Sequence, residues 1–120
     1  MSKYFKPAEF RRCTPACEES DMDPQFLELL DQFREFVGIP LVLTCAYRSR
    51  AYDIAKKRSG NSAHTRGKAV DILCQSNATR FRIVYAALHF GFRRIGIGKN
   101  FVHLDKDASL PQCVIWTYYE

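Results

Sequence analysis

Two short segments, residues 62–72 and 96–105, carry the side chains that most constrain how this chain can fold. The first contains His64 and Asp71, and the second contains His103. Two histidines and one carboxylate form the ligand set that a mononuclear catalytic zinc uses when a fourth position is left for water. If these residues share an ion, the fold must bring the two segments side by side, with His64 on a loop that leads into the strand of Asp71.

Strand geometry adds a neighbour to this set. Residues two apart in a strand point to the same face, so Phe101, His103 and Asp105 share one face of the strand predicted over residues 101–105. If His103 binds a metal, Asp105 can accept a hydrogen bond from its imidazole or act as a proton-transfer group.

Taken by itself, the same pattern also fits histidines without a metal. His64 can be an ordinary loop residue, and His103 can be a strand histidine whose ring is satisfied by hydrogen bonds. A third histidine, His89, falls inside a predicted helix and is interpreted as a packing or surface residue. The residues alone therefore leave a metal site and a purely structural role both open.

Two longer helices are indicated by their end signals. The first is predicted to begin at Pro24 after the N-cap Asp23 and to end at Gly38. The second is predicted to run to about residue 90 after a cap at Ser76 or Asn77. The spacing of its large apolar residues places the following on one side of that helix: Phe81, Val84, Tyr85 and Leu88.

Runs rich in β-branched and aromatic residues predict the strands. These cover residues 41–47, 68–74, 93–97, 101–105 and 113–118. Between the first two, residues 48–58 indicate a short helix or an irregular loop, and the first twenty residues indicate a helical turn and a loop over the core. The 120 residues show no repeat or linker, so we predict one domain, residues 1–120, of α+β class with helices packed on a mainly antiparallel sheet.

Composition and charge narrow the classes of function. The net charge of +5 comes from scattered basic residues without a nucleic-acid motif, so no nucleic-acid partner is expected. No apolar run approaches the ~18 residues of a spanning helix, and no signal peptide is visible. We therefore expect synthesis in the cytoplasm and no membrane partner. The five cysteines, an odd number, are expected to be reduced and mostly buried.

Three motifs, in this order along the chain, resemble one known family. Residues 46–49, with the sequence Ala-Tyr-Arg-Ser, resemble the Y-R-S/T element of the zinc D-alanyl-D-alanine carboxypeptidases. Residues 62–71 match the S-x-H-x-x-G-x-A-x-D pattern of that family at Ser62, His64, Gly67, Ala69 and Asp71. Residues 101–105 resemble its later histidine strand. The family includes VanY-like peptidases and phage endopeptidases, and the hedgehog signalling domain shares its fold, so the resemblance implies that fold here.

The resemblance implies a role for each matching residue. His64, Asp71 and His103 correspond to the ligands of one zinc ion per chain. Arg48 corresponds to an arginine that anchors the substrate, since its fork suits a carboxylate or a carbonyl oxygen and can stabilise the oxyanion. A surface ion pair is the other interpretation of Arg48. Ser62 either hydrogen-bonds the substrate or shapes the loop.

One position departs from the family pattern. Many members place Glu or Asp three residues before the last histidine, as the base that activates water, whereas this chain has Asn100 there. The side chain of Asn100 cannot take a proton. Either Asp105 or another carboxylate replaces the base, or turnover is slow, or the protein binds its ligand without cleaving it.

The resemblance thus implies a zinc metallopeptidase acting on peptidoglycan. It would hydrolyse stem peptides at the amide bond of a D-amino acid, with a zinc-activated water as nucleophile. The alternative is a non-catalytic zinc-binding module that recognises a cell-wall peptide or a protein partner. Because no signal peptide is visible, we expect the protein to act at the cell wall after release, as a phage or prophage lysis enzyme does. We also expect a monomer.

Overall fold

A five-stranded sheet organises the chain. The computed structural model describes residues 2–56 and 58–118. Its strands are β1 (Leu43–Cys45), β2 (Ala69–Leu73), β3 (Arg94–Ile97), β4 (Phe101–Asp105) and β5 (Val114–Thr117). They lie in the order β1-β2-β4-β3-β5, and neighbours are antiparallel except β3 and β5, which are parallel. The prediction of an α+β fold with a mainly antiparallel sheet is confirmed.

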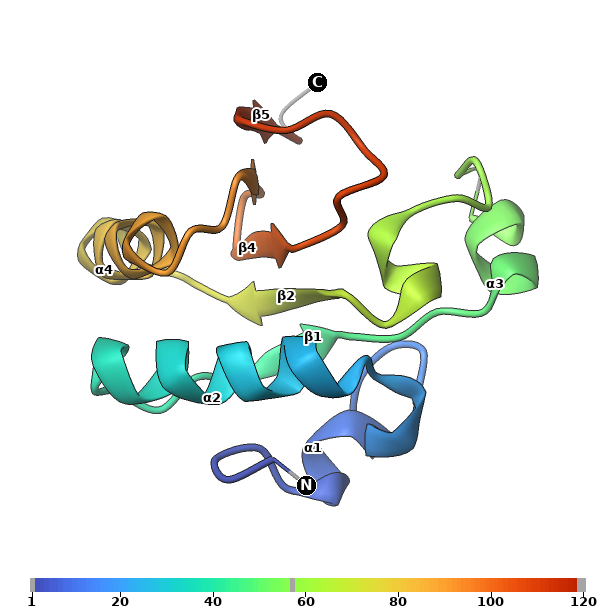
Figure 1. The fold of residues 1–120 in the computed structure, drawn as a ribbon, viewed down its shortest axis with the longest axis horizontal. Helices are drawn as coiled ribbons and strands as arrows, with labels where there is room; N and C mark the ends of the chain where they lie inside the picture. The colour runs from blue at the N-terminus through green and yellow to red at the C-terminus, as the bar shows by residue number, and fades with distance from the viewer. Residues whose placement is uncertain (1, 57, 119–120) are drawn as a thin grey trace.

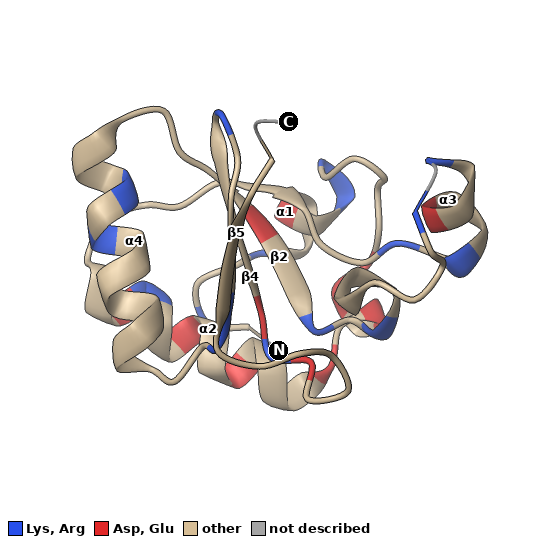
Figure 2. Ribbon diagram, turned by 90° about the horizontal axis from the view of Figure 1, so that it is seen from above, with Lys and Arg blue, Asp and Glu red and all other residues tan. Residues whose placement is uncertain are grey.

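Helices flank this sheet. They are α1 (Pro7–Arg11), α2 (Pro24–Val37), α3 (Arg50–Ala55) and α4 (Asn77–His89), with 3-10 turns η1 (Glu19–Asp21) and η2 (Ala63–Arg66). Helix α2 packs against α4 and runs along β1 and β2 (Figure 1). Figure 2 shows α4 on one side of the sheet and α3 on the other. No helix in the described part of the chain is long and apolar enough to cross a membrane.

The predicted caps hold both longer helices. The Asp23 carboxylate accepts a hydrogen bond from the backbone N–H of Phe26 (2.9 Å), and Gly38 ends α2 with φ of 76°. At the start of α4, the Ser76 hydroxyl accepts a hydrogen bond from the N–H of Thr79 (3.1 Å). Of the two caps that the sequence allowed for α4, Ser76 is the one used.

The first strand is shorter than predicted because its last residues serve the loop of His64. The prediction covered residues 41–47, but β1 ends at Cys45. Beyond it, the carbonyl of Ala46 lies 2.5 Å from the ring of His64, and the N–H of Arg48 donates to the carbonyl of His64 (3.2 Å). The later strands match their predictions to within one residue at each end. Residues 48–58 contain the short helix α3, and Lys57 in that stretch lies outside the described residues.

Strand β4 separates the two faces of the sheet. Val102 and Leu104 are fully buried and belong to the apolar core between the sheet and the helices α2 and α4. Phe101, His103 and Asp105 alternate with them and therefore point to the opposite face, as the sequence predicted. That opposite face carries the polar residues considered below.

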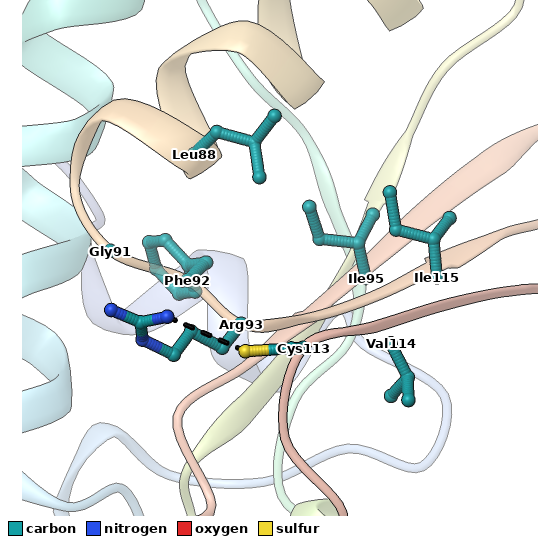
Figure 3. A pocket seen from close by; sticks show the side chains of 8 residues that line it. All are labelled: Leu88, Gly91, Phe92, Arg93, Ile95, Cys113, Val114 and Ile115. Atoms are coloured by element: carbon teal, nitrogen blue, oxygen red, sulfur yellow. Dashed lines mark hydrogen bonds between the residues drawn. The ribbon is translucent and has the colours of Figure 1, made fainter.

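Helix α4 turns the apolar side predicted from its large residues toward solvent. Phe81, Tyr85 and Leu88 are 71%, 57% and 56% exposed, whereas Val84, predicted on the same side, is partly buried against the core. The side of α4 that packs inward carries Ile83, Ala86 and Ala87. Close packing against the sheet and α2 favours the small side chains of Ala86 and Ala87. At the end of α4, a cavity of about 330 Å³ opens between Leu88, Ile95 and Ile115 (Figure 3).

His89 is exposed and stacks on Phe36 with ring centroids 4.4 Å apart, in agreement with a surface role.

The cysteines behave as reduced, mostly buried side chains. All five are free thiols, and Cys113 is the exposed one. Burial raises the pKa of Cys13 to about 12, so this thiol is uncharged at neutral pH. The prediction that the thiols are mostly buried is confirmed.

Candidate metal centre

The polar face of the sheet carries one row of residues that crosses all five strands. In this row Cys45 pairs with Asp71, Asp71 pairs with His103, His103 pairs with Gly96, and Gly96 pairs with Trp116. Directly paired residues share a face, so the side chains in this row are neighbours. Two of the three predicted metal ligands, Asp71 and His103, thus lie beside each other in the sheet although they are 32 residues apart in the chain.

His64 reaches this row from η2, the turn that precedes β2. Gly67 ends that turn with φ of 69°, and a Cβ atom there would lie 2.5 Å from the carbonyl oxygen of Asp21. The close approach also allows the N–H of Asp23 to donate to the carbonyl of Gly67 (2.9 Å). The glycine of the sequence motif therefore lets the turn dock on the start of α2, and His64 becomes buried over the sheet.

The two predicted histidine ligands converge on one oxygen atom of the third ligand, Asp71. His103 Nδ1 lies 2.9 Å from Asp71 Oδ1, and His64 Nε2 lies 3.4 Å from the same oxygen. The outer nitrogen of each ring faces an acceptor: His64 Nδ1 lies 2.5 Å from the carbonyl oxygen of Ala46, and His103 Nε2 lies 2.7 Å from Asp105 Oδ2. Since each outer nitrogen can donate its proton to that acceptor, the inner nitrogens are left to face Asp71.

Cys45 adds a sulfur atom to the cluster. The donor atoms of Cys45, His64 and Asp71 all lie within 4.8 Å of one another, so this group could hold a metal ion. The sulfur itself is 3.7 Å from Nδ1 of His64, the nitrogen that faces the carbonyl of Ala46. The sequence analysis did not select Cys45, because only the register of β1 against β2 reveals that it pairs with Asp71. Two ligand sets, one with His103 and one with Cys45, thus share His64 and Asp71.

The charges in the cluster suit a bound cation. Burial disfavours the protonated forms of His64 and His103, but their contacts with Asp71 and its neighbours outweigh this effect and raise the pKa of both imidazoles. Burial likewise opposes ionisation of Asp71, yet the two imidazoles lower its pKa. The two imidazoles and the Asp71 carboxylate therefore favour each other's charged forms in the metal-free protein. Imidazole nitrogen and carboxylate oxygen are zinc ligands, so these residues fit a zinc ion that would take the place of the imidazole protons.

A cavity of about 120 Å³ opens onto this cluster. All six residues that the sequence singled out line it: His64, Asp71, His103, Asp105, Arg48 and Ser62. Asn100 is instead on the exposed turn between β3 and β4, where its carbonyl accepts a hydrogen bond from the N–H of Cys74 (2.9 Å). The fold thus brings the predicted site residues together.

Arg48 and Ser62 are connected through a buried carboxylate. Asp53 is fully buried and accepts hydrogen bonds from the Ser62 hydroxyl (2.9 Å) and from the N–H of Gly60 (2.9 Å). The Nε atom of Arg48 lies 3.1 Å from Asp53 but is not aligned for a hydrogen bond, so this buried N–H has no such partner among the described residues. Ser62 therefore shapes its loop in this structure, and Arg48 is held beside the cavity by charge.

Comparison with known proteins places the chain in a family. The peptidase M15 family matches residues 3–105, which include every predicted site residue. The chain belongs to the peptidase M15 family. This membership implies a peptidase, and M15 peptidases depend on zinc, in agreement with a cluster that could hold a metal ion. No curated protein matches the chain.

One wall of the cavity lies beyond the part of the chain that matches the M15 family. Trp116 and Tyr118 line the cavity from β5 and the residue after it, and the sequence analysis did not assign them to the site. A Cβ atom on Gly96 would lie 2.7 Å from Nε1 of Trp116, so the glycine makes room for the indole. The indole consequently reaches His103, with ring centroids 5.4 Å apart. In this M15 peptidase an aromatic wall thus stands next to the candidate ligands.

Proposed function

We propose that the protein is a zinc metallopeptidase that hydrolyses peptidoglycan stem peptides at the amide bond of a D-amino acid. The observation that carries this proposal is the convergence of His64 Nε2 and His103 Nδ1 on Asp71 Oδ1 at the floor of a cavity. Membership of the M15 family supports the peptidase activity, and the resemblance of residues 62–71 to the D-alanyl-D-alanine carboxypeptidases supports the choice of substrate.

We assign one zinc ion to His64, Asp71 and His103 rather than to the set that contains Cys45. The Cys45 sulfur approaches Nδ1 of His64, and that nitrogen is already 2.5 Å from a backbone carbonyl. Nε2 of His64, by contrast, faces the same Asp71 oxygen as His103. Three protein ligands of this kind leave a coordination position free, as catalytic zinc sites require.

The zinc ion and the side chains that line the cavity would have different roles in hydrolysis. When bound, the zinc ion would supply the polarisation of the scissile carbonyl and a lower pKa for an attacking water. Arg48 would bind a carboxylate or the carbonyl oxygen of the substrate, because it lines the cavity and the fork of its guanidinium suits such oxygens. Phe101, Trp116 and Tyr118 would pack on the peptide and exclude bulk water from the cavity.

Few side chains that line the cavity could accept a proton during hydrolysis. Asp71 and Asp105 are the carboxylates among the described residues that line the cavity. With Asp71 assigned to the metal, we propose that Asp105 holds the Nε2 proton of His103, at a distance of 2.7 Å. Proton transfer by Asp105 during the reaction stays a prediction, and Asn100 offers no replacement.

The burial and the contacts of Asp105 favour a second candidate function. Asp105 is fully buried and its oxygens already contact His103, Arg94 and the backbone N–H of Asp107. If it cannot accept a further proton, the protein would be a non-catalytic zinc-binding module that recognises a cell-wall peptide or a protein partner. Under either function we propose a monomer that acts at the cell wall after its release.

Hydrolysis distinguishes the two functions. We would incubate the zinc-loaded protein with purified sacculi and with a synthetic stem peptide ending in D-alanyl-D-alanine, and identify the products by mass spectrometry. The peptidase predicts release of D-alanine or a split stem peptide, lost in His103→Ala and retained in the control Phe81→Ser, whose side chain is exposed on α4. Stoichiometric zinc with all substrates intact would instead support the binding module.

A further inference from the structure

We propose that Arg94 is a positioning residue that fixes His103 for metal binding by clamping Asp105. This inference rests on the proposed function, because it takes His103 as a ligand of the zinc ion. Neither the sequence motifs nor the family match assigns a role to Arg94. Its guanidinium, however, links the outer nitrogen of His103 to the wall of the cavity.

The first link is an ion pair across the sheet. Arg94 on β3 and Asp105 on β4 are directly paired residues, so their side chains leave the sheet on the same face. Arg94 Nε lies 2.9 Å from Oδ1 and 3.1 Å from Oδ2 of Asp105. The N–H of Asp107 donates to Oδ1 as well (3.1 Å). The carboxylate is therefore held by two donors on one side while Oδ2 stays directed at His103.

The second link fixes the guanidinium itself. Arg94 Nη1 donates to the carbonyl oxygen of Pro111 (2.7 Å), and the guanidinium carbon lies 4.9 Å from the ring centroid of Trp116. Arg94 is thus held by the loop after β4 on one side and by β5 on the other. Because the guanidinium is planar and its donors have fixed directions, this arrangement leaves the Asp105 carboxylate little freedom to rotate.

The consequence for His103 is a fixed ring orientation. Asp105 is fully buried, so a variant without the arginine leaves a buried carboxylate lacking its compensating charge. Such a carboxylate can reorient, and His103 Nε2 then loses a defined acceptor. Since the outer hydrogen bond of a ligating histidine sets the direction and basicity of its inner nitrogen, loss of Arg94 should weaken metal binding without removing any ligand.

The test measures zinc affinity rather than activity. We would determine the zinc dissociation constant by chelator competition for wild type, Arg94→Gln and Arg94→Lys, with Arg93→Gln as the matched control. Arg93 is the preceding arginine, is exposed, and approaches only Cys113 among the contacts of its side chain in the described structure. We expect Arg94→Gln to raise the dissociation constant by at least about tenfold, Arg94→Lys to raise it less, and Arg93→Gln to change it by less than about twofold.

A second readout reports on His103 directly. In a long-range proton–nitrogen NMR spectrum of the zinc-loaded protein, the Nε2 proton of His103 should be visible in wild type and exchange faster with water in Arg94→Lys. This comparison also decides the matter if Arg94→Gln does not fold.

Unchanged zinc affinity and unchanged exchange of that proton in Arg94→Lys, together with unchanged affinity in any folded Arg94→Gln protein, would overturn the role of Arg94 while leaving the proposed function intact. A wild-type protein that takes up no zinc would overturn both.

Discussion

Two faces of one sheet carry different kinds of residue, and strand β4 contributes to both. Val102 and Leu104 are fully buried in the apolar core against the helices. His103 and Asp105 are also buried, but on the opposite face, where each contacts a charged or ionisable neighbour. Burial of apolar surface stabilises the first face, whereas the second depends on matched charges and hydrogen bonds. Stability and metal binding should therefore be separable by substitutions at adjacent positions.

The largest expected effect is on the polar face. His103→Ala should weaken zinc binding by about a thousandfold, since it removes one of three ligands from a site whose total binding free energy is of the order of 10 kcal/mol. In the metal-free protein it should leave the fold intact, because Val102 and Leu104 still hold the strand. Chelator competition and circular dichroism measure the two quantities. A variant that unfolds without metal would show that the two faces are not independent.

The next effect is on the apolar face. Leu104→Ala should lower the free energy of unfolding by about 3 kcal/mol through the lost burial and the cavity left behind. The folded protein should still bind one zinc ion with nearly unchanged affinity. Urea denaturation checks the stability, and Leu88→Ala on the exposed side of α4 is the matched control, with an expected change within about 0.5 kcal/mol. A loss of zinc affinity in folded Leu104→Ala would contradict the separation.

The pH dependence should differ between the metal-free and zinc-loaded protein. The pKa values of His64 and His103 are raised, so their contribution to metal-free stability is complete in weak acid and is lost as pH rises through these folded-state pKa values. The pKa of Asp71 is lowered, so its contribution is present above its unfolded pKa and is lost only in strong acid. Zinc must displace the imidazole protons. Below the pKa values of the two imidazoles, the zinc affinity should therefore fall by about tenfold for each unit by which the pH is lowered, for each proton displaced.

Calorimetric zinc titrations in buffers of different ionisation enthalpy test this point, because they count released protons. Release should be clear near neutral pH in wild type and smaller in His103→Ala. Zinc binding without proton release in wild type would show that the imidazoles are already neutral.

The smallest expected effect concerns the loop beside the cavity. Ser62→Ala removes a hydrogen bond to buried Asp53 and should cost about 1 kcal/mol of stability. If Ser62 only shapes the loop, the zinc affinity should stay unchanged and any change in KM should be small. Thermal unfolding and steady-state kinetics on the stem peptide provide the comparison. A large rise in KM at unchanged stability would instead assign Ser62 to the substrate.

Local signals explain what could be predicted from the sequence. The caps at Asp23 and Ser76 and the stop at Gly38 are short-range patterns, so both longer helices were located correctly. The strand of His103 was predicted from its β-prone residues, and the two-residue spacing within it placed His103 and Asp105 on one face. The inward side of α4 was harder to predict, because its large residues and its small residues form two apolar sides and only packing decides between them.

Long-range pairing explains what the sequence did not reveal. Cys45 and Trp116 join the site through strand registers that link distant parts of the chain, and no local pattern specifies those registers. The role of Gly96, where any side chain would collide with Trp116, is equally invisible before β3 and β5 are paired. Motif residues could thus be identified in advance, while the residues that surround them required the fold.

The most direct test of the metal centre is X-ray absorption at the zinc edge of the zinc-loaded protein. Ligation by His64, Asp71 and His103 predicts one zinc per chain with nitrogen and oxygen neighbours at about 2.0–2.2 Å and no sulfur. A sulfur neighbour at about 2.3 Å would place Cys45 on the metal and contradict this ligand set, as would a protein that takes up no zinc.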